Sequence, residues 1–379
     1  MSSTTTYPNY SPGLEGVIAG ISKISEIDSE HSSLQYRGYN VHELAEQGSY
    51  EETAYLLLFE KLPDRAELAA FKKTLGEERE PPQQVYDALA LAPKGTHPME
   101  LIRIGYSVLA AHDPEVAAND HETNLRKAVR IVAKAGAVVA AAHRIQHGEK
   151  PMQADPSMGL AESFLYLLQG KRPDEYTTKV MDASFTLYAE HGFNASTFAC
   201  RVCVSTLSDL YSGVISGMST LKGPLHGGAN EKAMQMILEI GTPENADKWI
   251  HAALAEKRLV MGFGHREYKH GDSRAFYMTR VAKDIGKRMG NTKYGEIADV
   301  LEKVMLEEKG LHPNVDFPTG YAYYLLGLPI PLYTPIFVIS RLAGYCAHGI
   351  EQLDHNRLIR PKCIYEGPSN LKYVPLADR

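Results

Sequence analysis

The chain has 379 residues, of which 44% are hydrophobic and 23% are charged, and its formal net charge is −6. This length allows two or three domains with a large buried core, and the composition is that of an ordinary soluble globular protein. A slightly acidic chain offers no general positive field to nucleic acid or to an anionic membrane, so an anionic ligand would need a local cluster of cations.

Two segments bear on targeting and membranes. Residues 1–12 contain neither a basic region nor an apolar core, so we expect no signal peptide. Residues 321–340 carry no formal charge, as a membrane span would, but glycine and proline residues break the run. We interpret it as two buried helices joined by a proline turn, and we expect a cytoplasmic protein that binds neither membrane nor nucleic acid.

The four cysteines do not form a recognisable metal site. Cys200 and Cys203 make a C-x-x-C pair, but Cys346 and Cys363 do not supply the second pair that a zinc site normally needs. We therefore expect Cys200 and Cys203 to be packed residues on an apolar helix, and we expect no bound metal.

The chain is predicted to be all-α except near its start. Residues 17–39 alternate loosely and predict a small β-hairpin, after which helices begin at Val41. Asp64 is a plausible N-cap, and the tail over 359–379 has little periodicity, so we expect it to wrap over a neighbour or over its own core. Helices are predicted over 50–60, 65–79, 83–91, 99–111, 123–147, 159–169, 174–189, 196–221, 230–241, 243–257, 272–289, 294–308, 315–326 and 332–354.

A glycine-rich turn surrounds His226 in the sequence Gly223-Pro-Leu-His-Gly-Gly-Ala-Asn230. The helical pattern that follows would place the imidazole at a helix N-terminus, where free N–H groups disfavour protonation of the ring. A neutral imidazole can donate an N–H to a developing enolate oxygen. Alternatively, the glycines only mark a tight turn and the histidine has no catalytic role.

A second glycine turn, Gly262-Phe-Gly-His-Arg266, is followed by the cations Lys269 and Arg274. Arginine binds carboxylate in a bidentate fork, so His265 beside this cluster suits a small dicarboxylate or a phosphate. A solvated basic loop is the alternative. No strand precedes the Gly-x-Gly, so a dinucleotide-binding fold is not supported.

Asp316 follows His312-Pro-Asn-Val315 and precedes Phe317. A carboxylate beside apolar residues is partly desolvated, which raises its pKa toward useful basicity. Alternatively, Asp316 is the N-cap of the next helix. Our hypothesis is that His226, His265 and Asp316 meet in one cleft and perform acid–base chemistry on a carbon acid.

Two further residues stand in unusual places. His191 lies between two predicted helices, the second capped by Asn194 or Ser196, and is either a ligand contact or a helix-end residue. Arg341 interrupts an apolar run, where an unpaired arginine is costly, so the alternative to a ligand role is an ion pair with an acidic residue such as Glu351.

Taken together, these motifs resemble the citrate synthase family over nearly the whole chain. The order and spacing of the His226, His265 and Asp316 motifs carry the resemblance, although Ser273 stands where relatives more often have proline. The length resembles the compact bacterial and archaeal branch. Further matching segments are Gly16-Val-Ile-Ala, Gln35-Tyr-Arg-Gly-Tyr, residues 51–63, His97-Pro-Met-Glu, Glu190-His-Gly-Phe-Asn-Ala-Ser and Asn356-Arg-Leu-Ile-Arg-Pro.

The resemblance implies a homodimer whose subunits have two helical domains. Residues 1–227 and 328–379 would form the large domain, and 228–327 the small domain that closes over the substrates. The implied reaction is the condensation of acetyl-CoA with oxaloacetate to citrate and CoA, a step of the tricarboxylic acid cycle. Acetyl-CoA is then a co-substrate, and no separate cofactor is implied.

The resemblance also implies roles for individual residues. Asp316 would remove a methyl proton from acetyl-CoA, His226 would stabilise the enol, and His265 would polarise the oxaloacetate carbonyl. The implied oxaloacetate ligands are His191, Asn194, Arg274 and Arg341, with Arg360 from the other subunit. The implied CoA contacts are Leu259, Val260, Met261, Gly262, Phe263, Gly264, Asn314 and Lys309.

Two other functions fit the same sequence. The 2-methylcitrate synthases share the triad and use propionyl-CoA, and one methyl group in an acyl pocket is worth only about 1–3 kcal/mol. A catalytically silent, ligand-binding helical dimer is the alternative from another class, and the intact triad argues against it.

Overall fold

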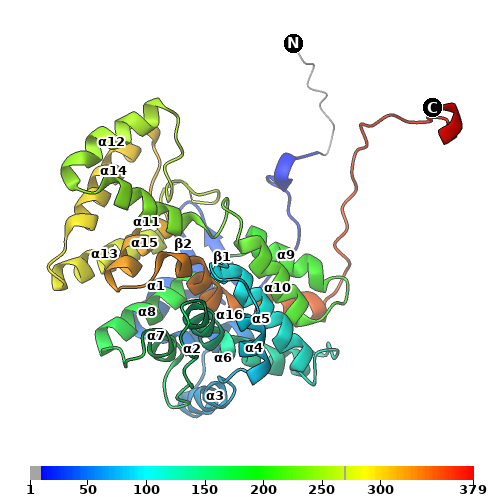
Figure 1. Cartoon of the computed structure of the whole chain (residues 1–379), viewed down its shortest axis with the longest axis horizontal. Helices are drawn as coiled ribbons and strands as arrows, with labels where there is room; N and C mark the ends of the chain where they lie inside the picture. The colour runs from blue at the N-terminus through cyan, green and yellow to red at the C-terminus, as the bar shows by residue number, and fades with distance from the viewer. Residues whose placement is uncertain (1–9, 269) are drawn as a thin grey trace.

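The computed structural model describes residues 10–268 and 270–379, and it confirms the predicted all-α fold (Figure 1). The first ten helices are α1 (Val41–Gln47), α2 (Tyr50–Phe59), α3 (Arg65–Glu77), α4 (Gln83–Ala90), α5 (Pro98–His112), α6 (His121–Gln146), α7 (Leu160–Gln169), α8 (Glu175–Tyr188), α9 (Ala195–Val204) and α10 (Leu210–Leu221). The others are α11 (Ala229–Ile240), α12 (Pro243–Ala255), α13 (Ser273–Arg288), α14 (Lys293–Lys309), α15 (Asp316–Leu325) and α16 (Tyr333–Asp354). Short 3₁₀ turns occupy Pro12–Leu14, Ile330–Leu332 and Leu376–Asp378.

The predicted hairpin exists but is shorter than expected. Strands β1 (Ser25–Asp28), β2 (Ser33–Tyr36) and β3 (Tyr39–Asn40) form one antiparallel sheet in that order. The prediction that the β region begins at residue 17 was wrong, because residues 17–21 have no strand partner. Their apolar side chains stand in solvent, with Ile18 90% exposed and Ile21 88% exposed.

Helix α16 is the central helix of the core. It contacts α2, α5, α6, α8, α9 and α10. By length and composition alone the segment Ile330–Asp354 could cross a membrane, but it is mostly buried within the protein. Together with α15, which ends at Leu325 before the proline turn, it confirms the prediction of two buried helices over 321–340.

Side-chain caps begin helices α3 and α10, and only the first of these caps was predicted. Asp64 caps α3 as predicted, accepting the N–H of Glu67. The single helix predicted over 196–221 was wrong, because the chain breaks between α9 and α10. Leu207 there has a left-handed backbone with φ 67°, which ends a helix. Asp209 then accepts the N–H of Ser212 at 2.9 Å and starts α10.

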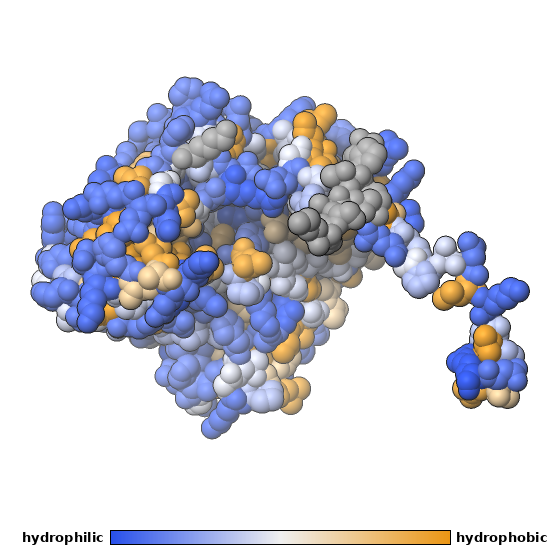
Figure 2. All heavy atoms as spheres, turned by 90° about the horizontal axis from the view of Figure 1, so that it is seen from above, coloured by the Kyte–Doolittle hydropathy of each residue, from blue (hydrophilic) through white to orange (hydrophobic). Residues whose placement is uncertain are grey.

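Helices α11 to α15 pack on one another in a lobe at the upper left of Figure 1. This lobe contacts the rest of the protein at α1, α8, α16 and the turn at Ile330–Leu332. Figure 2 looks down on the same arrangement and shows the surface hollowed near its middle, between the lobe and the remaining helices. The turns that carry the predicted catalytic residues all border this junction.

The C-terminal tail does not cover its own core. Beyond α16 the chain runs away from the body (Figure 1), and nearly every residue of 355–379 is exposed. Its first part is held near the end of α9, where Asn356 donates to the Ser205 carbonyl at 3.1 Å and the Ile359 N–H donates to the Ser205 hydroxyl at 3.1 Å. The expectation that the tail wraps its own core was therefore wrong, and wrapping over a neighbour remains a prediction.

Glycine at position 344 of α16 is required by the close approach of α8. A Cβ at this position would lie 2.4 Å from the Ala189 carbonyl oxygen and 2.5 Å from Oε2 of Glu190. We predict that Gly344→Ala lowers the thermal denaturation midpoint, because overpacking of a rigid core destabilises by about 1–3 kcal/mol.

Gly295 in α14 supplies the matched control, because a Cβ there would meet only Lys283 Cγ at 3.4 Å. Gly295→Ala should be neutral or slightly stabilising, since alanine is the better helix former. Equal midpoints for Gly344→Ala and the parent would contradict the packing account.

Candidate active site

Three turns at the junction of lobe and body carry the predicted triad. His226 lies in the turn between α10 and α11, His265 in the loop between α12 and α13, and Asp316 is the first residue of α15. All three are half-buried, as expected of side chains that line a cleft. Ser196, Asn194 and His191 link His226 to His265, and Asp272 links the loop of His265 to the backbone before Asp316.

His226 is anchored by the start of α9. Its Nε2 accepts the backbone N–H of Ser196 at 3.3 Å and lies 2.7 Å from the Ser196 hydroxyl. Because a peptide N–H can only donate, the ring proton of the neutral imidazole must lie on Nδ1. Burial and the nearby Arg341 charge lower the pKa of His226 to about 4. The ring is therefore a neutral donor at physiological pH.

The sequence predicted that free N–H groups of a helix N-terminus would keep the His226 ring neutral. The ring is neutral, but the helix that supplies the N–H group is not the predicted one. Helix α11 begins at Ala229, after the N-cap Gly228, and His226 precedes it by one further turn of chain. The free N–H group that holds the ring belongs instead to the N-terminus of α9.

His265 is held in the same way by its own loop. Its Nδ1 accepts the backbone N–H of Glu267 at 3.0 Å and that of Tyr268 at 3.4 Å. The proton must therefore lie on Nε2. Burial and the charge of Arg274 lower the pKa of His265 to about 4. This second ring is also a neutral donor.

Asp316 is a partly desolvated carboxylate. Burial raises its pKa to about 6, although a hydrogen bond from Tyr188 and the charges of Arg274 and Arg341 oppose the rise. The Tyr188 hydroxyl donates to Oδ1 at 2.8 Å. The alternative that Asp316 is an N-cap was wrong, because Val315 holds that position and no side chain caps α15. Asp316 is thus available to take a proton near neutral pH.

Asp272 joins the loop of His265 to the start of α15. Its carboxylate accepts from Arg274 Nε at 3.0 Å and Nη2 at 2.9 Å, and the Val315 N–H donates to it at 3.1 Å. Both side chains of the pair are almost completely buried. Asp272 therefore fixes the guanidinium of Arg274 and the backbone that positions Asp316.

Arg341 is a buried cation without an acidic partner. It is 1% exposed, its Nε donates to the Tyr188 carbonyl at 2.7 Å, and its guanidinium lies 4.7 Å from the ring centroid of Phe337. Within residues 10–268 and 270–379, no carboxylate lies within ion-pair distance of it. The alternative of an ion pair with Glu351 was wrong, because Glu351 pairs with Arg201 at 2.7 Å. An anionic ligand would supply the missing charge.

His191 lies against His265, with ring centroids 5.0 Å apart. Its Nε2 is 3.2 Å from the Tyr268 hydroxyl, and burial lowers its pKa well below the ordinary value. Asn194 is the N-cap of α9, accepting the N–H of Thr197 at 3.0 Å, and its side-chain nitrogen donates to the His191 carbonyl at 3.3 Å. The structure thus brings both residues to the edge of the His265 site.

A buried ionic network lies beneath this loop. Glu190 accepts from His348 Nε2 at 2.9 Å and from the Ser25 hydroxyl at 3.0 Å. His348 Nδ1 in turn lies 2.9 Å from a guanidinium nitrogen of Arg201. These bonds tie the loop that carries His191 to β1, α9 and α16.

The predicted CoA loop runs beside the segment that leads to Asp316. Asn314 N–H donates to the Gly262 carbonyl at 2.9 Å, and Gly264 N–H donates to the His312 carbonyl at 2.8 Å. Gly262 has φ 85°, and a Cβ there would lie 2.7 Å from Phe317, so only glycine fits. Of the other predicted contacts, Val260 is buried, Met261 and Phe263 are half-buried, and Leu259 and Lys309 are exposed.

The structure places Arg360 away from the triad of its own chain and does not describe Lys269. Arg360 is exposed on the tail, next to the end of α9. Lys269, assigned to the cation cluster beside His265, lies outside the described residues.

Cys200 and Cys203 are free, with Cys200 buried on α9 as predicted. No group of three or more His, Cys, Asp or Glu suited to a metal ion occurs in the described part of the chain.

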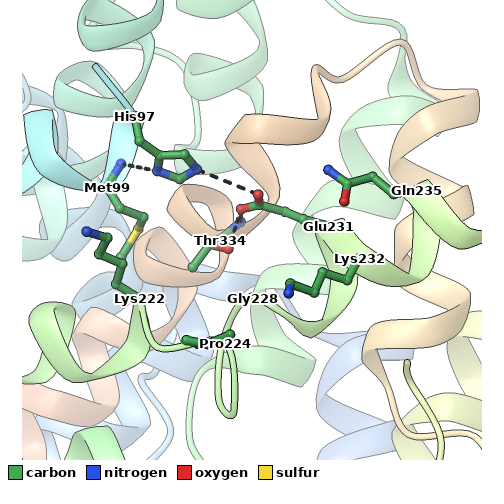
Figure 3. A pocket seen from close by; sticks show the side chains of 9 residues that line it. All are labelled: His97, Met99, Lys222, Pro224, Gly228, Glu231, Lys232, Gln235 and Thr334. Carbon is green, nitrogen blue, oxygen red and sulfur yellow. Dashed lines mark hydrogen bonds and ion pairs between the residues drawn. The ribbon is translucent and has the colours of Figure 1, made fainter. Parts of the chain in front are cut away.

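A small cavity of about 170 Å³ lies next to the turn that carries His226, but it contains none of the triad (Figure 3). Within it, Glu231 of α11 accepts from the Thr334 hydroxyl of α16 and lies 3.6 Å from His97 Nε2 at the start of α5. These contacts connect the first helix of the lobe to two helices of the body. The cavity therefore marks the joint between them rather than the site of chemistry.

Comparisons with known proteins show which family the chain belongs to. The family described as "Citrate synthase, C-terminal domain" matches residues 13–362. The chain belongs to the citrate synthase family. Its relatives include "Citrate synthase 2" of Bacillus subtilis, 43% identical over 97% of this chain and 98% of the relative. A "2-methylcitrate synthase" of Mycobacterium tuberculosis is also 43% identical, over 95% of this chain and 91% of the relative.

A solved structure extends the family match to the fold. Citrate synthase of Thermoplasma acidophilum, solved as a ternary complex with carboxymethyl coenzyme A and oxaloacetate, matches with a TM-score of 0.93 and 34% identity. The match covers 98% of this chain and 99% of that chain. The resemblance inferred from the sequence motifs is thereby confirmed at the level of family and fold.

Sequence reasoning missed the residues that support the triad. Ser196 was considered only as a cap, and Asp272 and Tyr188 were not considered at all. Asp272 carries a usable signal, because an aspartate two residues before Arg274 at a helix start is well placed to cap the helix and pair with the arginine. Tyr188 and Ser196 carry none, since their partners lie 128 and 30 residues away in the chain.

We predict that Asp272→Asn destabilises the protein and lowers its catalytic activity. Removing one partner of a buried ion pair costs about 3–5 kcal/mol, and here it also loosens the backbone before Asp316. Thermal denaturation and steady-state activity, measured on the same preparations, test both effects.

The matched control is Asp299→Asn, which removes the partner of Lys283 on the surface of the same lobe. Exposed pairs contribute about 0–1 kcal/mol, so this variant should resemble the parent. If the two variants lose equal stability, Asp272 does not hold the special position assigned to it.

Proposed function

We propose that this protein is a citrate synthase that condenses acetyl-CoA with oxaloacetate to give citrate and CoA. The observation that carries the proposal is the combination of two neutral, oriented histidines with a carboxylate whose pKa is raised to about 6. A buried arginine without a counterion lies beside them. Such a site suits a proton abstraction next to a carbonyl, followed by attack on a dianionic ketone.

In the first step, Asp316 removes a proton from the methyl group of acetyl-CoA. A thioester methyl group is a poor acid, so the oxygen that gains negative charge must be stabilised as the proton leaves. The Nδ1–H of His226 donates to that oxygen, because Nε2 is occupied by the start of α9. The product of this step is the enolate of acetyl-CoA, hydrogen-bonded to His226, with the removed proton on Asp316.

In the second step, the enolate carbon attacks the ketone carbon of oxaloacetate. The Nε2–H of His265 donates to the ketone oxygen and polarises it, since Nδ1 is held by the loop backbone. Arg274 and Arg341 bind the two carboxylates, with His191 and Asn194 at the edge. The new carbon–carbon bond turns the ketone oxygen into an alkoxide, which takes up one proton, equal to the one that Asp316 removed, to give citryl-CoA. Water then cleaves the thioester to release citrate and CoA.

The loop over residues 259–264, with Asn314 and Lys309, forms the CoA side of the site in this proposal. Residues 228–327 act as a small domain that closes over both substrates. The contacts of Glu231 with His97 and Thr334 connect this small domain to the body (Figure 3). Closure would exclude water until the carbon–carbon bond has formed.

A second copy of the chain completes the site in this proposal. The tail carries exposed apolar side chains, among them Tyr365, Leu371 and Tyr373, which a neighbouring subunit would cover. Arg360 lies at the start of this tail, away from its own cleft. We assign it to the oxaloacetate site of the partner, in a homodimer.

The 2-methylcitrate synthase reaction is the second candidate function. The similarity to the Mycobacterium tuberculosis protein, 43% identical, is the observation that favours it. It differs only in the use of propionyl-CoA, whose additional methyl group changes binding by about 1–3 kcal/mol. The two functions follow the same steps, except that propionyl-CoA loses the proton from the methylene carbon next to its thioester.

Release of free CoA thiol in the presence of oxaloacetate tests the proposal. We expect release with acetyl-CoA, and comparison with propionyl-CoA decides between the two functions. Asp316→Ala should abolish condensation while leaving oxaloacetate binding intact, because the base does not hold the dianion. Arg341→Ala should instead weaken oxaloacetate binding. An inactive parent with both acyl-CoAs would contradict the enzyme function.

The pH dependence follows from the three pKa values. Asp316 must be ionised to accept a proton, so activity should rise with pH through a midpoint near its pKa of about 6. The pKa values of His226 and His265, about 4, lie below this range, so both rings stay neutral throughout it. A pH profile of kcat/KM measures the midpoint. Loss of activity as pH rises from about 5 to 7 would contradict these assignments.

A further inference from the structure

We propose that Tyr188 is a positioning residue that selects Oδ2 of Asp316 as the oxygen that takes the substrate proton. This inference rests on the proposed function, because it assumes that Asp316 is the base. The carboxylate has two oxygens, and Tyr188 occupies one of them.

The geometry at Asp316 is asymmetric. The Tyr188 hydroxyl donates to Oδ1 at 2.8 Å. Among the described residues, no other side chain makes a hydrogen bond to the Asp316 carboxylate. The backbone N–H of Asp316 donates to Oδ1 of Asn314 at 3.1 Å. The hydrogen-bonded Oδ1 is the less basic oxygen, so the proton goes to Oδ2.

Tyr188 is itself held by two contacts from α16. It is the last residue of α8 and is 1% exposed. Its ring meets Phe337 edge-on with centroids 4.5 Å apart, and its carbonyl accepts from Arg341 Nε at 2.7 Å. One residue of the body therefore fixes both the base, which belongs to the lobe, and an arginine of the oxaloacetate site. The Tyr188 hydrogen bond to Asp316 therefore joins lobe and body and depends on their relative position.

The hydroxyl also opposes the effect of burial on Asp316. Burial raises the pKa of Tyr188 well above its ordinary value, so the phenol keeps its proton and donates. A donated hydrogen bond favours the ionised carboxylate and lowers its pKa. The titratable and charged groups that face Asp316 are Tyr188 on α8, Asp272 and Arg274 at the start of α13, Tyr323 on α15 and Arg341 on α16.

The test is the pH profile of kcat/KM for Tyr188→Phe. Loss of a hydrogen bond to an ionised group should move the acid limb upward by about one pH unit or more. The activity of the variant relative to the parent should therefore rise about tenfold or more between the acid limb and the alkaline plateau. Oxaloacetate binding, measured directly, should be unchanged, because the carbonyl that holds Arg341 remains.

Tyr106→Phe is the matched control, since Tyr106 is equally buried and donates one hydrogen bond to the Ile131 carbonyl at 2.8 Å. It should leave the acid limb in place. If Tyr188→Phe fails to fold, 3-fluorotyrosine placed at position 188 keeps the ring and strengthens the donor, so the acid limb should move downward.

An acid limb that stays at the parent value in Tyr188→Phe, or in the fluorotyrosine protein, would overturn the inference. The activity of the parent enzyme, measured in the same assays, tests the proposed function separately. An inactive parent refutes the reaction itself, whereas an active parent with an unshifted variant refutes only the role of Tyr188.

Discussion

The active-site geometry depends on peptide N–H groups that donate to the rings of two half-buried histidines. The N–H of Ser196 occupies Nε2 of His226, and the N–H of Glu267 occupies Nδ1 of His265. A peptide N–H cannot accept, so each bond fixes both the tautomer and the direction of the remaining ring proton. Because burial also keeps the rings neutral, each can donate to a carbonyl oxygen without first being protonated.

The same desolvation shapes the charged groups around the rings. It makes Asp316 a stronger base than a free carboxylate. It also makes the unpaired Arg341 unfavourable in the unliganded protein, whereas Arg274 keeps the partner Asp272. The buried Glu190, beneath the loop of His191, offsets part of the positive charge of Arg341, and this charge in turn helps to lower the pKa of Glu190. The site is thus less stable than an apolar core would be, and a bound dianion would offset that difference.

Local sequence patterns predicted the turns of the site but not their supports. Glycines and prolines around His226, His265 and Asp316 marked these residues, because such turns need particular backbone conformations. The helix that anchors His226 was misassigned, since the packing of α9 against the turn after α10 has no local signature. The break between α9 and α10 was missed for a related reason. An apolar run continues across Leu207, and no sequence pattern predicts the left-handed backbone of that residue. Family resemblance supplied residue roles that periodicity alone left open.

The most direct test of the account is the protonation state of the two histidines, measured by NMR of ¹⁵N-labelled imidazoles. Variants in which His226 or His265 is replaced assign the signals. At about pH 7 both rings should be neutral, with the proton of His226 on Nδ1 and that of His265 on Nε2. A doubly protonated ring, or the opposite tautomer at either residue, would contradict the account. Neither histidine would then present the donor on which the proposed chemistry depends.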